Sequence, residues 1–115
     1  MRTRTVPWLI SFLLTTAAGV ALLLCLPARA QETNESLFKG KCAMCHGPDG
    51  AGKTAMGQAL KIPDLQSPEV QKKSDADLTA IITKGKNKMP AYEAKLSKEQ
   101  IDKLVAYIRD LAKKH

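Results

Sequence analysis

Of the three cysteines in the chain, the two beyond residue 30 lie in one five-residue segment, Cys42-Ala43-Met44-Cys45-His46. Two thiols three residues apart, followed directly by an imidazole, place three potential ligand groups at one point of the chain. The chain beyond residue 30 contains three aromatic residues, Phe38, Tyr92 and Tyr107, so its hydrophobic core is thin. A domain this small is marginally stable without a disulfide, a metal or a cofactor. We therefore expect the stabilising group at this segment.

The first 30 residues have the features of a secretory signal peptide. Two arginines precede an apolar run from Val6 to Leu26, and the segment Pro27-Ala28-Arg29-Ala30 matches a small-residue cleavage site. We expect cleavage after Ala30, which leaves residues 31–115 as the mature domain. The alternative is an uncleaved anchor, because a run of 21 apolar-rich residues is just long enough to span a bilayer. Either way the domain lies outside the cytoplasm, and we expect it in the periplasm.

Charge and composition exclude several classes of partner. Without its leader the chain has 15 basic and 11 acidic residues, a net charge of +4. Aromatic residues make up 4% of the whole sequence, too few for a stacking platform that binds single-stranded nucleic acid. No recognition element for duplex DNA accompanies the positive charge. We therefore expect no nucleic-acid partner, and contact with a membrane only if the leader is retained.

Local patterns predict an all-α domain with three to four short helices and long loops. Four segments begin with a residue type that caps helices, followed by an acid, a proline or a glutamine in the first turn. These caps are Thr33 or Asn34, Ser67, Ser74 and Ser97. The last predicted helix has apolar residues at steps of three and four, and the third ends at Gly85. Residues 54–65 and 86–94 are predicted loops, and no alternating strand pattern appears.

The C-x-x-C-H spacing is the pattern of c-type haem attachment. Each thiol can form a thioether to a vinyl group of haem, and His46 then stands beside the iron as its proximal ligand. A redox-active C-x-x-C pair would need a βαβ setting, which is missing. A zinc site needs four ligands, and only the motif and the terminal His115 could supply them. A copper site or a plain disulfide fits less well, so we predict haem.

A six-coordinate haem iron needs a second side chain, either His or Met, opposite His46. The candidates are Met44, Met56, Met89 and His115. The terminal histidine is prone to fraying, and Met44 lies inside the attachment segment. Met56 lies in the loop nearest the attachment side. Met89 precedes Pro90, which keeps it out of helical geometry and suits a side chain that points inward from a loop. We therefore expect Met89 as the second ligand; the alternative is a core-filling side chain.

Five pieces of the sequence together are typical of one family. They are Leu37-Phe38, the C-x-x-C-H motif, Ile62-Pro63-Asp64-Leu65, Met89-Pro90-Ala91-Tyr92, and Leu104 with Tyr107. From Asn34 to Lys113 the chain resembles a class I c-type cytochrome, the small soluble monohaem kind of bacteria. The resemblance implies a cytochrome c-like fold wrapped around one covalent haem c, with Cys42, Cys45, His46 and Met89 as the residues that hold it.

The resemblance also implies two details of structure. The first and last helices would cross through Phe38, Leu104 and Tyr107. In this family the carbonyl of a proline at the position of Pro63 accepts a hydrogen bond from the proximal histidine.

The expected function is one-electron transfer between exported or membrane-bound redox proteins. With His46 and Met89 on the iron, no position stays open for substrate, so we expect no enzymatic activity. A haem-bearing subunit of a larger oxidoreductase or oxidase is the alternative.

Lys84, Lys86 and Lys88 flank Met89 with no acid among them. We expect them to form a positive patch that attracts redox partners with an acidic surface.

Overall fold

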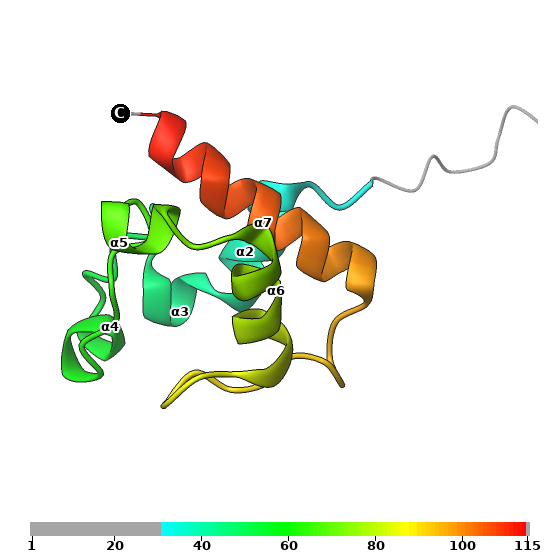
Figure 1. Ribbon diagram of the computed structural model, residues 1–115. Coiled ribbons are helices and arrows are strands. Elements are labelled where there is room, and N and C mark those ends of the chain that lie inside the picture. Colours follow the sequence, from blue (N-terminus) through cyan, green and yellow to red (C-terminus); the bar gives the residue numbers. More distant parts are fainter. Residues whose placement is uncertain (1–30, 115) are drawn as a thin grey trace, which may run out of the picture. The chain divides into compact units, whose positions relative to one another are not determined.

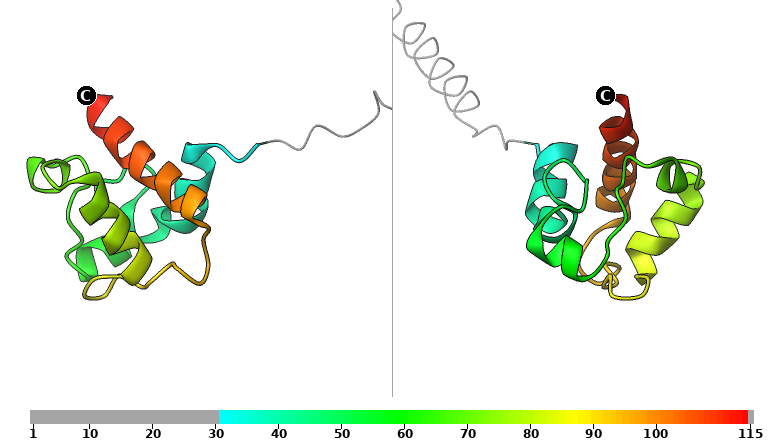
Figure 2. Two further views of the ribbon diagram at one scale, coloured as in Figure 1. Left: turned by 45° about the vertical axis from the view of Figure 1, so that its right-hand side comes forward. Right: turned by 90° about the vertical axis from the view of Figure 1, so that its left-hand side faces the viewer.

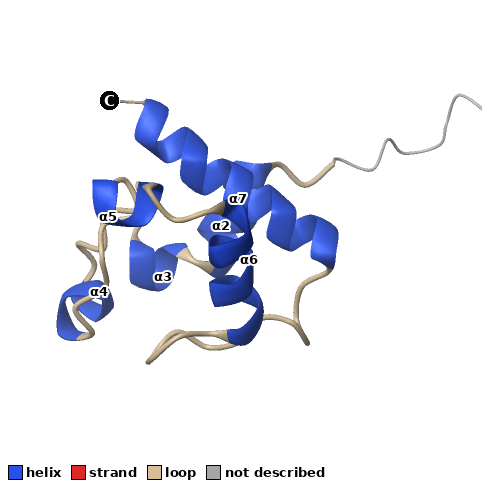
Figure 3. Ribbon diagram, in the orientation of Figure 1, coloured by secondary structure: helices blue, strands red, loops and turns tan. Residues whose placement is uncertain are grey.

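The computed structural model describes residues 31–114, and those residues form helices and loops (Figures 1 and 3). The expected leader, residues 1–30, and His115 lie outside the described part. The helices are α2 (Asn34–Lys41), α3 (Ala43–His46), α4 (Ala55–Ala59), α5 (Pro68–Gln71), α6 (Asp75–Lys84) and α7 (Lys98–Lys113). Within residues 31–114 no strand forms, and none of the helices is long and apolar enough to cross a membrane.

Three of the four predicted helix starts are confirmed by side-chain hydrogen bonds, whereas Ser67 precedes α5 (Pro68–Gln71) without a side-chain cap bond. The Thr33 side chain caps α2 by accepting from the backbone N–H of Ser36. Ser74 and Ser97 begin α6 and α7 with capping boxes. In each box the serine hydroxyl accepts from the backbone N–H three residues later, and the side chain of that later residue accepts from the backbone N–H of the serine. Gly85 ends α6 with a φ of 75°. These caps fix where the loops around the cavity begin and end.

Residues 31–114 form six helices, more than the three to four that we predicted. The segment 54–65, predicted as a loop, contains the one-turn helix α4, and a break at Cys42 separates α3 from α2. Only α2, α6 and α7 are eight residues or longer. The all-α, loop-rich class is nevertheless confirmed, and residues 86–94 form the predicted loop.

The core is centred on the contact between α2 and α7, which lie side by side in both views of Figure 2. Leu37, Phe38 and Leu104 are at most 1% exposed. The ring centroids of Phe38 and Tyr107 lie 5.0 Å apart with the planes tilted by 44°, a favourable aromatic arrangement. The predicted crossing of the first and last helices through these residues is thus confirmed.

One arginine ties α7 to the segment between α5 and α6. The Arg109 guanidinium donates to the Asp75 carboxylate at 2.8 Å and to the Gln71 carbonyl oxygen at 2.8 Å. Because these bonds join residues 34 and 38 positions apart, they hold α5 and α6 against the last helix. Val70 of α5 and Leu78 of α6 are thereby fixed as walls of the cavity described next.

Candidate functional site

One cavity of about 560 Å³ contains all four residues that the sequence singled out, Cys42, Cys45, His46 and Met89. Its walls are mostly aliphatic side chains from the loop before α5 and from α5, α6 and α7. Six of them are buried: Leu65, Val70, Leu78, Ile82, Leu104 and Ile108. A large apolar cavity with a few convergent polar groups is the usual form of a cofactor site.

The segment that contains both cysteines is fixed by short-range hydrogen bonds. The Thr54 hydroxyl donates to the Cys45 carbonyl at 2.8 Å and accepts from the Gly57 N–H at 2.9 Å. The Gly52 N–H donates to the His46 carbonyl at 2.7 Å. The first turn of α4 and the glycine-rich turn before it therefore hold α3 in place.

Gly57 allows α4 to pack directly on α3. A Cβ atom at this position would lie 2.6 Å from the Cys45 carbonyl oxygen and closer still to that of Gly52. Carbon does not approach backbone oxygen so closely, so a side chain would force α3 and α4 apart. Gly57 lies in the segment predicted as a loop, and no local pattern in the sequence distinguishes it from other glycines.

The imidazole of His46 is partly buried, and its Nδ1 atom forms no hydrogen bond with any described residue. The hydrogen bond to the Pro63 carbonyl, expected from the family resemblance, is therefore not formed in the structure, although Pro63 lines the same cavity. Burial lowers the pKa of His46, which favours the neutral imidazole. Neutral imidazole is the form that binds a metal ion through its unprotonated nitrogen.

The two thiols are free and partly buried. Burial, and to a lesser extent the neighbouring Cys45, raise the pKa of the Cys42 thiol to about 11. Redox-active cysteines have a lowered thiol pKa, so this environment does not favour a thioredoxin-like pair. Among residues 31–114, moreover, no cluster of three or more His, Cys, Asp or Glu side chains could hold a metal ion.

The loop that contains Met89 is closed by backbone contacts at both ends. Lys86 and Met89 exchange two backbone hydrogen bonds, of 2.9 and 3.2 Å. Gly85 lies under the loop, and a Cβ there would be 2.6 Å from the Met89 carbonyl oxygen. The Tyr92 N–H donates to the Ile82 carbonyl at 3.1 Å. Met89 is thus held at the cavity, whereas Met56 does not line it and is 46% exposed.

The mouth of the cavity is strongly basic. Its five cationic residues are Lys41, Lys61, Lys73, Lys86 and Lys88. Glu69 is the single acidic residue among those that line it. Of the predicted patch, Lys86 and Lys88 are at the cavity, whereas Lys84 lies in the last turn of α6 and does not line it. Lys41, Lys61 and Lys73 were not predicted, because they are distant from Met89 in sequence.

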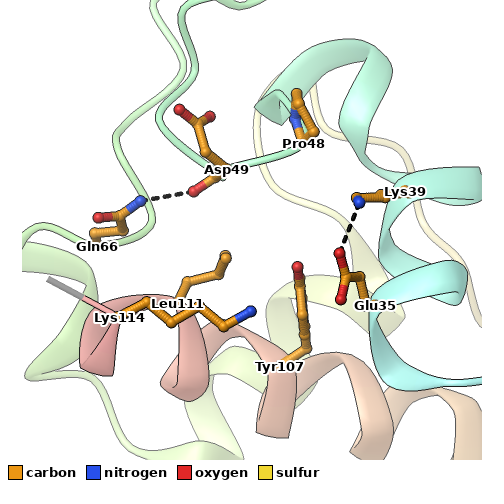
Figure 4. Close-up of a pocket in the computed structure, with 8 residues that line it drawn as sticks. All are labelled: Glu35, Lys39, Pro48, Asp49, Gln66, Tyr107, Leu111 and Lys114. Carbon is orange, nitrogen blue, oxygen red and sulfur yellow. Dashed lines mark hydrogen bonds and ion pairs between the residues drawn. The ribbon is translucent and has the colours of Figure 1, made fainter.

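A second, smaller cavity of about 270 Å³ lies between α2, α7 and the turn at Pro48 (Figure 4). Four of its polar residues, Glu35, Lys39, Asp49 and Gln66, already have partners. Lys39 pairs with Glu35 at 2.6 Å, and the Gln66 amide donates to the Asp49 carbonyl at 2.7 Å. None of the four predicted site residues lines it.

Comparison with known proteins decides between the possible occupants of the larger cavity. Residues 29–108 match the profile of the family described as cytochrome C oxidase, cbb3-type, subunit III. A cytochrome c6-like protein of Nostoc sp. (strain PCC 7120 / SAG 25.82 / UTEX 2576) is 35% identical over 95 residues, 76% of this chain and 78% of that protein. Cytochrome c6 of Thermosynechococcus vestitus is 32% identical over 111 residues, 90% of this chain and 93% of that one.

A solved structure agrees with these relatives. The c-type cytochrome KustC0563 aligns with a TM-score of 0.64 at 30% identity, over 69% of this chain and 96% of that one. The chain belongs to the class I c-type cytochromes. As a member of this family it binds haem c covalently and transfers single electrons between redox proteins.

The residues of this cytochrome suit such a group. Two free thiols, a partly buried imidazole and a thioether lie around an apolar space of cofactor size. The sequence motifs identified these four residues, but they did not identify the groups that position them. Thr54 and Gly57 on one side, and Gly85 and Tyr92 on the other, act through contacts that no spacing rule describes.

Proposed function

We propose that Cys42 and Cys45 carry the two thioether bonds to haem, and that His46 and Met89 are the axial ligands of its iron. The supporting observation is that these four residues line one cavity, whereas Met56 lies outside it. When bound, the haem iron supplies the one-electron couple. His46 and Met89 would occupy both axial positions, and the soft sulfur ligand would favour the reduced form.

The remaining residues of the cavity have two tasks in this proposal. The aliphatic side chains of α5, α6 and α7 exclude water, so little solvent has to reorganise during electron transfer. The contacts of Thr54 with Cys45 and of Gly52 with His46 would hold the imidazole in position while the iron changes oxidation state. The loop around Met89 offers Glu93 as its one acid with no His or Arg beside it, which supports a carrier rather than an enzyme.

Mass spectrometry of the denatured protein tests the attachment. We expect the mass of one haem to remain on the chain through acid–acetone extraction, and a tryptic peptide containing Cys42 and Cys45 to carry it. Cys45→Ser should leave a single thioether and raise the absorption maxima of the pyridine haemochrome to longer wavelength. Haem that is extracted by acid–acetone, or a disulfide between the two cysteines, would contradict the proposal.

We also propose that residues 1–30 are a signal peptide and that the cytochrome is exported to the periplasm. The support is the sequence pattern of this segment and its small-residue site before Gln31. N-terminal sequencing of the protein from a periplasmic extract should give Gln31 as the first residue. Recovery of the full-length chain in the membrane fraction would instead indicate a retained anchor.

We propose that the basic mouth of the cavity receives acidic redox partners. Five lysines against one glutamate give this face an excess of positive charge beside the redox centre. Such a face increases the association rate with an oppositely charged surface, and salt reduces the effect over a Debye length of about 10 Å at 0.1 M. We expect the second-order rate of electron transfer to an acidic partner to fall as ionic strength increases.

Two double variants of equal charge separate docking from net charge. Lys86→Gln with Lys88→Gln removes two charges at the mouth, whereas Lys98→Gln with Lys113→Gln removes two from the ends of α7, outside it. The first pair should slow electron transfer at low salt more than the second. Equal rates for both, or a rate independent of salt, would assign these lysines to the general surface.

A second candidate is a haem-bearing subunit of a larger oxidoreductase. It is favoured by the family profile, whose description names an oxidase subunit. Native size in a mild detergent extract distinguishes the two: a free carrier migrates near the size of its own domain, and a subunit co-migrates with other chains.

A further inference from the structure

The break between α2 and α3 leaves the backbone carbonyl of Lys41 without its helical partner. In a continuous helix the Cys45 N–H would donate to the carbonyl of Lys41. Here it donates to Cys42 at 3.2 Å, and the His46 N–H donates to the same Cys42 oxygen at 2.9 Å. Among the backbone N–H groups of residues 31–114, none donates to the Lys41 carbonyl. This oxygen belongs to the residue directly before the first cysteine of the motif.

The hydroxyl of Tyr92 supplies the missing donor. It donates to the Lys41 carbonyl oxygen at 3.2 Å, across 51 residues of sequence. Tyr92 lies three residues after Met89, and its side chain lines the larger cavity. Its backbone is also anchored, because its N–H donates to Ile82 and its carbonyl accepts from Lys95 and Leu96. The side chain therefore joins a fixed point of the loop to the attachment segment.

We propose that Tyr92 is a positioning residue whose hydroxyl ties the Met89 loop to the start of the haem-attachment segment. The inference rests on the proposed function, in which Met89 binds the iron. The hydrogen bond spans the cavity mouth from the loop to Lys41, so it opposes movement of the loop away from the cavity. Without this bond, the hydrogen bonds that hold the loop near Met89 are backbone bonds, to Lys86 and to α6.

The test compares Tyr92→Phe with Tyr107→Phe in the holoprotein. Both variants remove one phenolic oxygen, but the Tyr107 hydroxyl forms no hydrogen bond with any described residue and lies at the second cavity. One hydrogen bond corresponds to roughly a threefold to tenfold change in an equilibrium constant. Added imidazole displaces Met89 from the iron. Ferric Tyr92→Phe should therefore bind imidazole roughly threefold to tenfold more tightly than wild type. Tyr107→Phe should bind it as wild type does.

Amide hydrogen exchange gives a second readout that does not depend on ligation. In Tyr92→Phe the Tyr92-position amide, bonded to Ile82, should exchange faster by a similar factor, because the loop opens locally more often. The Gly52 amide, bonded to His46, should keep its wild-type rate. Imidazole affinity and loop exchange equal to wild type would overturn the positioning role.

The two proposals fail in different ways. If Met89 is not the ligand, the ferric protein either lacks a sulfur-to-iron charge-transfer band or keeps it in Met89→Ala, and the proposed function fails. If Met89→Ala abolishes that band and Tyr92→Phe changes neither imidazole binding nor loop exchange, only the role of Tyr92 is wrong.

Discussion

The two sides of the haem cavity are held by different kinds of contact. On the attachment side, the partners of Cys45 and His46 lie within nine residues of them, at Thr54 and Gly52. On the Met89 side, the hydrogen bond that crosses the cavity mouth joins Tyr92 to Lys41, 51 residues away. The first side is built from local turns, and the second is a loop laid over the cavity.

This difference has an energetic consequence. Local contacts re-form quickly after a fluctuation, whereas a contact over a long loop must again overcome the entropy of closing it. Segments with few buried contacts also open with the smallest free energy. We therefore expect the Met89 side to open first, while the histidine side stays closed until the domain unfolds.

The largest effect should follow from Gly57→Ala. The new methyl group would overlap the carbonyl oxygens of Gly52 and Cys45, and neither can move without separating α3 from α4. We expect a loss of about 3 kcal/mol in the free energy of unfolding, at the upper end for overpacked sites. Denaturant unfolding of the holoprotein, followed by circular dichroism, measures it.

Gly40→Ala is the matched control, since a Cβ at Gly40 in α2 meets nothing within 4 Å. It should stabilise the domain slightly, because alanine favours a helix over glycine by about 1 kcal/mol. Equal losses for both variants would show that Gly57 is not a point of close approach.

A smaller and more local effect is expected for Gly85→Ala. Gly85 has a φ of 75°, and its Cβ would lie 2.6 Å from the Met89 carbonyl oxygen. We expect a loss of about 2 kcal/mol, concentrated in the Met89 loop. The charge-transfer band of the ferric protein should weaken at denaturant concentrations where the helices remain folded. Loss of the band only together with the helical signal would mean that the two sides are not independent.

The smallest of the three effects is expected for Thr54→Val, which keeps the shape but removes the hydroxyl. The Cys45 carbonyl and the Gly57 N–H each lose a partner. A loss of about 1–2 kcal/mol follows from the usual value of such bonds. Global unfolding should shift while the charge-transfer band at low denaturant stays intact. A weakened band in this variant would contradict the assignment of Thr54 to the attachment side alone.

The sequence predicted the elements that are defined by short-range chemistry. The capping boxes at Ser74 and Ser97 are four-residue patterns, and the structure contains both. The helix α4 was missed because its segment contains Gly57 and lacks an apolar repeat. It forms because Thr54 caps it through the Gly57 N–H, which is a local contact, and because it packs on Cys45 of the preceding helix.

The same distinction applies to the site. The motifs located Cys42, His46 and Met89 because covalent attachment and ligation require particular residue types. They could not show that the Tyr92 hydroxyl meets Lys41, since this contact depends on how α2 ends and how a distant loop folds back. The basic mouth was likewise only half predicted, because Lys41, Lys61 and Lys73 reach it from separate segments.

The most direct test of the account is the ferric spectrum of Met89→Ala beside that of Met56→Ala. Met56 is the alternative thioether, half-exposed and outside the cavity. We predict that Met89→Ala keeps its covalent haem, loses the sulfur-to-iron charge-transfer band, and binds CO when reduced, whereas Met56→Ala behaves as wild type. A band that persists in Met89→Ala, or that disappears in Met56→Ala, would contradict the ligand assignment.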